Sequence, residues 1–196
     1  MSVARKRSGA LRICLDPRHL NTALIRERYM NPTMEDILPE IGAARVFSKL
    51  DLSQGDWQCT LDEESSFYTT MVTLWGRYTW KRLPFRLKVS GEIFQRNFHE
   101  SLEGLAGVAC VADDILVYGS DQIFHDSRLT ELIKRCEEKH ISLNKHKCEF
   151  SVNRISFLGH IISDAGLEAD PEKVSAIAKM PAPTDAEGVQ RIMGSI

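Results

Sequence analysis

The chain has 196 residues, 43% of them hydrophobic and 27% charged, with a formal net charge of −2. This composition is typical of one globular domain, or of one domain and part of a second, and it excludes a disordered or fibrous protein. No apolar run approaches the roughly 18 residues of a membrane span, and the N-terminus lacks the apolar core of a signal peptide. Five cysteines without CxxC spacing favour reduced thiols inside the cell, in cytoplasm or nucleus, over a disulfide framework or a zinc finger.

The charge is unevenly distributed along the chain. Residues 1–31 carry seven basic and two acidic side chains, a net charge of +5, whereas the remaining 165 residues carry −7. A basic segment of this kind favours a surface that faces an anionic partner. A solvated face near the terminus explains the same pattern, and charge alone does not decide between the two.

The first half of the chain predicts mainly strands. Weak alternation predicts a strand over 11–16, and Thr33 with Asp36 forms a capping box for a short helix that Pro39 should disturb. Four further strands are expected, at 45–52, 57–61, 68–73 and 77–81.

The second half predicts alternating helices and hairpins. Ser90 is expected to cap a helix that continues to about Leu102. Two apolar runs, 108–111 and 115–119, flank an Asp-Asp pair and predict a hairpin. The remaining expected elements are a helix over 123–139, a hairpin over 157–162 around Gly159, a helix that Asp170 caps before Pro171, and a helix begun by Thr184 and Glu187. The last helix continues into the C-terminus, so a truncated chain is expected.

Two acidic sites are embedded in apolar strand sequence. Asp51 lies near the end of the predicted strand 45–52, and Asp113 and Asp114 separate the two strands of the predicted hairpin. A charge at a buried strand end is costly unless it is paired or bound to a metal. Three carboxylates on adjacent strands would bind two Mg²⁺ ions, which activate an attacking hydroxyl and stabilise a leaving phosphate oxygen. Ordinary turn chemistry explains an Asp-Asp pair equally well when the pair is considered alone.

Six short segments along the chain form an ordered series. They are LRICLDPRHLN at 11–21, FSKLDLSQG at 47–55, LPF at 83–85 with IFQR at 93–96, ADDILVY at 112–118, LN at 143–144 with KCEF at 147–150, and FLGH at 157–160. In this order they resemble the reverse transcriptase of Gypsy-type LTR retrotransposons over essentially the whole chain.

The resemblance implies an α+β fold shaped like a right hand. Its palm is an antiparallel sheet backed by helices, joined to partial fingers and to a truncated helical thumb. Fingers and palm are expected over residues 1–165, with the fingers incomplete at the N-terminus, and the start of the thumb or connection helices over 166–196. The RNase H and integrase domains of the parent polyprotein are expected to be absent.

The resemblance also assigns roles to individual residues. Asp51, Asp113 and Asp114 would be the catalytic residues and the metal ligands, for two Mg²⁺ ions or for Mn²⁺ in their place. Residues that would bind the incoming nucleotide are Arg12, Lys6, Asp56 and Lys147. Residues that would place the template or primer are Arg18, Asn21, Gln95, Leu158 and Gly159. Lys147 is a candidate proton donor to pyrophosphate, with a solvated lysine as the alternative, and ordinary β-packing is the alternative for the hairpin around Gly159.

Four positions depart from the family pattern. Asp56 stands where an aromatic residue usually lies beneath the nucleotide sugar, and its charge would oppose triphosphate binding. Arg86 replaces a glycine that allows close backbone approach. Gly91 replaces a proline, which loosens the start of the following helix, and Val111 replaces a tyrosine at a more tolerant position.

Three functions are therefore considered. The first is an RNA-directed DNA polymerase that uses an RNA or DNA template with a primer and deoxynucleoside triphosphates, with no membrane partner, and whose activity the substitutions and truncation impair. The second is a nucleic-acid-binding remnant without catalysis, and the third is an inert fragment of a decayed transposon. Salt-sensitive binding that survives loss of the carboxylates would favour the second.

Overall fold

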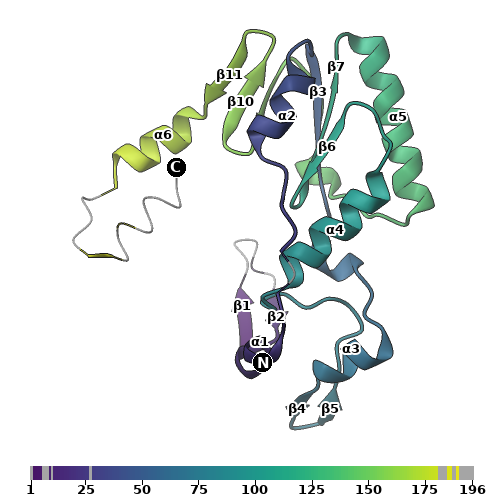
Figure 1. Cartoon of the computed structure of the whole chain (residues 1–196), viewed down its shortest axis with the longest axis vertical. Coiled ribbons are helices and arrows are strands. Elements are labelled where there is room, and N and C mark those ends of the chain that lie inside the picture. The colour runs from purple at the N-terminus through teal and green to yellow at the C-terminus, as the bar shows by residue number, and fades with distance from the viewer. Residues whose placement is uncertain are drawn as a thin grey trace.

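The centre of the molecule is a four-stranded antiparallel sheet (Figure 1). The computed structural model describes residues 2–5, 9, 11–26, 28–180, 185–186 and 189. The sheet has the order β6-β7-β3-β8, with β6 at Val108–Val111, β7 at Asp114–Gly119, β3 at Val46–Asp51 and β8 at Glu149–Val152.

Alternation along β7 buries both faces of this sheet. Ile115 and Val117 point into one apolar cluster, and Leu116 and Tyr118 point into another. The first cluster includes residues of α4 (Ser90–Leu102) and α5 (Gln122–Glu138). The second includes residues of α2 (Met34–Ile41) and of the β9–β10 hairpin (Arg154–Phe157 and His160–Ser163). A strand with two buried faces is costly to charge, so the acidic ends of β3 and β7 need compensation.

Smaller sheets extend from this centre. One hairpin pairs β1 (Ser2–Arg5) with β2 (Leu11–Cys14), and a second pairs β4 (Met71–Thr73) with β5 (Gly76–Tyr78) at the end of the molecule that also holds α3 (Figure 1). A third sheet has the order β11-β10-β9, with β11 at Gly166–Ala169. The remaining helical segments are α1 (Arg18–Ala23), α3 (Glu63–Tyr68), α6 (Pro171–Ala178), and the 3₁₀ turns η1 (Gly55–Gln58) and η2 (Lys145–Lys147).

Most expected elements are confirmed. The strand at the N-terminal motif, the strand that ends in Asp51, the Asp-Asp hairpin, the two long helices and the hairpin around Gly159 all form. The capping box of Thr33 and Asp36 is present, and Pro39 lies in the last turn of α2, where it removes one helical hydrogen bond without ending the helix at once. The helix expected from Thr184 and Glu187 lies outside the described residues.

The strand expected at 57–61 is wrong. The chain forms η1 there, and Thr60 makes a single bridge to Arg82. The strand expected at 68–73 is shorter because residues Glu63–Tyr68 form α3, whose N-cap Asp62 accepts the Ser65 N–H at 2.7 Å. The strand expected at 77–81 is Gly76–Tyr78.

The prediction that Ser90 caps α4 is also wrong. It is the first helical residue, and its hydroxyl donates to the Pro84 carbonyl at 2.8 Å. The expected boundary between residues 165 and 166 falls in the turn that joins β10 to β11, and it stays a prediction. All five cysteines are free. Within the described residues, no helix combines the length and the apolar character that crossing a bilayer requires.

Candidate active site

Asp51 and Asp114 are directly opposite residues in the β3–β7 ladder. Opposite residues in an antiparallel pair point to the same face of the sheet. Asp51 is 7% exposed, whereas Asp114 is half-buried. Asp113 precedes β7, in the turn where Ala112 adopts a left-handed φ of 51°. The sheet register therefore brings two of the three expected carboxylates together.

Two side chains from the η2 region compensate the Asp51 carboxylate. The Lys147 ammonium lies 2.8 Å from Asp51 Oδ2, and the Asn144 amide donates to Oδ1 at 3.1 Å. On the same face, Lys49 forms an ion pair with Glu149 at 3.3 Å. These residues surround a pocket of about 510 Å³, whose lining consists of Lys49, Asp51, Asp114, His146, Lys147, Cys148 and Glu149.

Burial and neighbouring charges together set the electrostatics of this pocket. Burial raises the pKa of the Asp114 carboxyl, and the Asp51 and Glu149 charges raise it further, against the opposing effect of the two lysines. The hydrogen bond to Asp51 raises the pKa of Lys147, and the charges of Asp51, Asp113 and Asp114 act in the same direction. The Lys147 ammonium is thus a cation on which the fields of all three carboxylates act.

The donor set suits a divalent cation only in part. Carboxylate oxygens are the ligands that Mg²⁺ prefers, and the raised pKa of Asp114 shows that a further positive charge would be favourable there. Among the described residues, however, no group of three or more His, Cys, Asp or Glu side chains is close enough to hold a metal ion. Asp51 and Asp114 therefore offer carboxylate oxygens on one face of the sheet, and the described geometry gathers no third carboxylate with them.

Gly55 and Gln95 hold the Asp-Asp turn in place. A Cβ on Gly55 would overlap Asp113 Oδ1 and lie 2.5 Å from a ring carbon of Phe94, so the turn requires a glycine. Gln95 is 1% exposed; its amide donates to the Cys110 carbonyl at 2.9 Å and accepts the Ala112 N–H at 2.7 Å. The Gln95 side chain is therefore used inside the protein, and any effect of it on a template strand is indirect.

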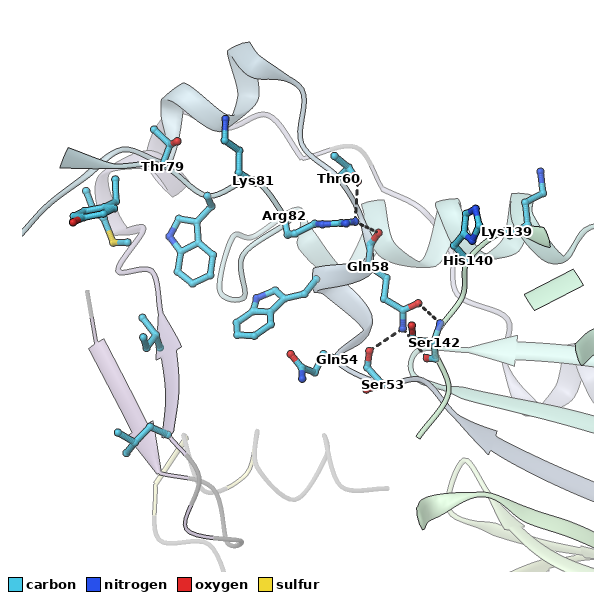
Figure 2. A pocket seen from close by; sticks show the side chains of 16 residues that line it. Ser53, Gln54, Gln58, Thr60, Thr79, Lys81, Arg82, Lys139, His140 and Ser142 are labelled. Atoms are coloured by element: carbon cyan, nitrogen blue, oxygen red, sulfur yellow. Dashed lines mark hydrogen bonds between the residues drawn. The ribbon is translucent and has the colours of Figure 1, made fainter. Parts of the chain in front are cut away.

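A second, larger pocket of about 1070 Å³ begins two residues beyond Asp51 (Figure 2). Trp57 packs against Trp80 and Phe85, with ring centroids 6.0 and 5.4 Å apart. The indole N–H groups of both tryptophans are buried and have no hydrogen-bond partner among the described residues. The lining residues come from β2, η1 and its flanks, β4, β5 and the residues after it, and the segment that follows α5: Leu11, Ile13, Ser53, Gln54, Trp57, Gln58, Thr60, Met71, Tyr78, Thr79, Trp80, Lys81, Arg82, Lys139, His140 and Ser142.

Gln58, which the sequence analysis did not single out, joins η1 in this pocket to the segment that follows α5. Figure 2 shows its amide between Ser53 and Ser142. The amide nitrogen donates to both carbonyls at 2.8 and 2.9 Å, and the amide oxygen accepts the Ser142 N–H at 2.8 Å. Asn144 was likewise missed as a partner of Asp51; its one sequence signal is a polar residue between the apolar Leu143 and a basic run.

The expected nucleotide-binding residues are only partly placed. Arg12 lies in β2 opposite Ala4, between two residues that line the larger pocket. Asp56 is half-buried in η1. Lys147 lies at the carboxylates, as described above, and Lys6 is outside the described residues.

The expected template and primer residues are spread over the surface and the core. Arg18 is exposed and forms an ion pair with Asp16 at 3.0 Å. The Asn21 amide bridges the Arg86 carbonyl and the Lys88 N–H, both at 2.9 Å, so it holds the loop in which Arg86 adopts a left-handed φ of 77°. Leu158 and Gly159 form the left-handed turn between β9 and β10, with φ of 49° and 78°.

The comparisons with known proteins agree with this architecture. The family model for reverse transcriptase (RNA-dependent DNA polymerase) matches residues 4–162. The chain is 34% identical to the retrovirus-related Pol polyprotein from transposon 412 of Drosophila melanogaster over 93% of its length, and 31% identical to that from transposon gypsy of the same organism, also over 93%. It spans 15% and 18% of the lengths of these two relatives.

The fold is shared with a solved viral enzyme. A foamy viral protease-reverse transcriptase, determined in complex with double-stranded DNA, matches with a TM-score of 0.84 at 23% identity, over 98% of this chain and 34% of that one. The antiparallel palm sheet with helices on its faces is the polymerase fold of these enzymes. The chain belongs to the reverse transcriptase family and is a reverse transcriptase domain of the kind found in retrotransposon Pol polyproteins.

Proposed function

We propose that this domain is an RNA-directed DNA polymerase core that adds deoxynucleotides to a primer 3′-hydroxyl. The observation that carries the proposal is the pairing of Asp51 with Asp114 in a common pocket, with Asp113 in the adjoining turn. Members of this family generally use divalent metal ions. Two Mg²⁺ ions, or Mn²⁺, held by the three aspartates would activate the attacking hydroxyl and stabilise the leaving phosphate oxygen.

Lys147 acts as the proton donor to the leaving pyrophosphate. Its raised pKa keeps the ammonium protonated at neutral pH, and the residue lies on Asp51 beside the reacting groups. A divalent cation held by Asp51 would compete with the Lys147 ammonium for the same carboxylate, and the ammonium would then be free to donate to the phosphate oxygens.

The larger pocket receives the incoming nucleotide and the template base. Trp57 and Trp80 offer aromatic rings for stacking, while Lys81, Arg82 and Lys139 supply positive charge. Arg12 and Lys6 contact the triphosphate, since a guanidinium suits phosphate oxygens. Asp56 opposes this binding by its charge, so the natural chain is an impaired enzyme.

Template and primer contacts complete the proposal. Arg18 contacts the template backbone, and the turn of Leu158 and Gly159 supports the primer end. Asn21 and Gln95 act indirectly, the first through the loop at Arg86 and the second through the Asp-Asp turn. The partner is a primed RNA or DNA template.

Primer extension on an RNA template with Mg²⁺ tests this function. The natural chain is compared with a variant that carries Asp56→Tyr, Arg86→Gly and Gly91→Pro, which restores the residues usual in the family. We expect weak extension by the natural chain and stronger extension by the variant. Absence of extension from both proteins, with salt-sensitive binding retained, would instead identify a nucleic-acid-binding remnant.

A further inference from the structure

A short antiparallel ladder joins the segment after α5 to the end of β3. Leu52 and Leu143 form an isolated antiparallel bridge. Beside this bridge, the Asn144 N–H donates to the Asp51 carbonyl at 2.8 Å, so Asn144 lies opposite Asp51. The Asn144 side chain also donates to Asp51 Oδ1 at 3.1 Å. The register of this ladder therefore sets which residue lies against the Asp51 carboxylate.

Lys147 reaches the same carboxylate from the turn that follows the ladder. Its backbone N–H donates to the Asn144 carbonyl at 3.0 Å, which ties η2 to Asn144. Its ammonium lies 2.8 Å from Asp51 Oδ2. A slip of the ladder by one residue would turn the Asn144 side chain to the other face and would carry η2 with it. Both side-chain partners of Asp51 therefore depend on this register.

The other end of the ladder, at Ser53 and Ser142, is only half formed by the backbone. The Ser53 N–H donates to the Ser142 carbonyl at 2.9 Å, whereas the Ser142 N–H donates to Gln58 Oε1 at 2.8 Å. In a regular hydrogen-bonded pair the two residues exchange both bonds. The chain leaves the ladder at this point because the Ile141 N–H donates back to the Cys136 carbonyl in α5, at 2.8 Å.

The Gln58 carboxamide takes the place of the second bond (Figure 2). Its oxygen accepts the Ser142 N–H, and its nitrogen donates to the Ser53 carbonyl at 2.8 Å and to the Ser142 carbonyl at 2.9 Å. One side chain thus bridges the two backbone groups that would bond each other in a regular pair. Without it, the ladder would consist of one bridge and two backbone hydrogen bonds, with Leu143 only half-buried. So small a pairing is a weak anchor by itself.

We propose that Gln58 is a positioning residue whose carboxamide completes this ladder and thereby holds both side-chain partners of Asp51 in place. The structural part of the inference is independent of the proposed function. The catalytic part rests on the proposed function, since it assumes that Asp51 and Lys147 act at the polymerase centre.

Hydrogen exchange at single amides, measured by NMR on the folded full chain, tests the structural part. Gln58→Met keeps the length of the side chain but removes its donor and its acceptor. The diagnostic amides are those of Ser53 and Asn144, which donate to backbone carbonyls rather than to Gln58. We expect their exchange to rise at least about tenfold as the ladder opens. A role confined to the contacts of Gln58 itself would accelerate exchange at the Ser142 amide alone.

Gln122→Met is the matched control. It also removes a glutamine carboxamide, but one that donates to the side chains of Asp126 and Ser151, and it should leave both diagnostic amides unchanged. If Gln58→Met lacks a cooperative thermal melt, Gln58→Glu replaces it. Glutamate keeps the shape and the acceptor oxygen, but at neutral pH its carboxylate has no N–H for the two carbonyls.

A disulfide across the ladder should substitute for Gln58. Leu52 and Leu143 are a non-hydrogen-bonded antiparallel pair, whose separation suits a disulfide. Leu52→Cys and Leu143→Cys are added to the Gln58→Met chain, and mass spectrometry of the bridged peptide verifies the bond. With the bridge formed, exchange at the Asn144 amide should return to the natural rate, and a reductant should raise it again. A verified bridge that leaves this exchange fast would count against the inference.

Activity of the same bridged chain supplies an independent readout. Bridge formation should raise kcat for nucleotide addition about tenfold, because it repositions groups at Asp51. The KM for the nucleotide should change less than about twofold, since Gln58 is absent in both redox states. Natural exchange at Ser53 and Asn144 in a folded Gln58→Met chain would overturn the inference. If exchange follows the prediction but neither the natural chain nor the bridged chain extends a primer, the inference stands and the proposed function is rejected.

Discussion

Asp51 and Asp114 face each other across the β3–β7 ladder, and both remain in a region that is short of positive charge. Like charges directly opposite each other destabilise a sheet. Lys147 and Asn144 offset part of this cost at Asp51. The pKa of the Asp114 carboxyl is raised, mainly by burial and further by the Asp51 charge. Bound divalent cations would offset the remaining repulsion between the two carboxylates.

The pH dependence of stability should report the Asp114 carboxyl. Because its pKa is higher in the folded than in the unfolded protein, the folded protein binds the proton more tightly, and stability falls as pH rises from about 4 through the folded-state pKa. Asp114→Asn should remove this fall and stabilise the chain at pH 7 by roughly 0.2–1 kcal/mol. Urea unfolding across this pH range checks it, with Asp164→Asn on the exposed β10–β11 turn as control; a less stable Asp114→Asn at pH 7 would reject the argument.

Gly55 and Gly91 form a matched pair for testing close packing at the Asp-Asp turn. Gly55→Ala should cost about 1–3 kcal/mol and lower primer extension, because the new methyl overlaps Asp113 and Phe94. Gly91→Ala has nothing within 4 Å of its new Cβ and lies in α4, so it should stabilise the chain by up to about 1 kcal/mol. Thermal melts and extension assays on both variants test this prediction. Equal changes in stability and in extension for the two variants would refute the packing argument.

Arg86 holds a backbone conformation that suits glycine. Its φ of 77° lies in the left-handed region, which costs an L-residue about 1–2 kcal/mol. Arg86→Gly should therefore stabilise the folded chain by about 0.5–1 kcal/mol after the entropy of glycine is subtracted. Arg86→Ala separates backbone from side chain, since it keeps the strain and should bring no gain in urea unfolding. A gain from alanine equal to that from glycine would assign the effect to the lost side chain.

Gln95 should be needed for the Asp-Asp turn although its side chain is buried. Gln95→Met keeps the shape of the side chain but leaves the Ala112 N–H and the Cys110 carbonyl without their partner. The expected cost is about 1–3 kcal/mol, together with faster hydrogen exchange at the Ala112 amide. Unchanged exchange at that amide would show that the turn holds itself.

The elements that position the carboxylates could be predicted from local sequence. Apolar runs on both sides of Asp113 and Asp114 indicate a hairpin, and the strand before Asp51 has the same apolar character, so the palm follows from patterns a few residues long. The strand expected at 57–61 fails because η1 is fixed by Gln58, whose partner Ser142 is distant in sequence.

The contacts that complete the site have no local pattern. Asn144 and Lys147 lie 93 and 96 positions from Asp51 in the chain, so no local pattern pairs them with it. The left-handed backbone of Arg86 could not be predicted for a different reason. Arginine rarely adopts this conformation, so the residue type argues against it. Local sequence patterns therefore predict neither the long-range hydrogen bonds nor the left-handed backbone at Arg86.

The rate of single-nucleotide addition to a primer on an RNA template tests the central claim most directly, with the natural chain, Asp113→Asn, and Asp164→Asn as a carboxylate control away from the site. The account predicts Mg²⁺-dependent addition by the natural chain and by Asp164→Asn, and a loss of at least roughly a hundredfold in Asp113→Asn, because a ligand of the proposed metal ions is removed. Equal rates for the natural chain and Asp113→Asn would contradict it.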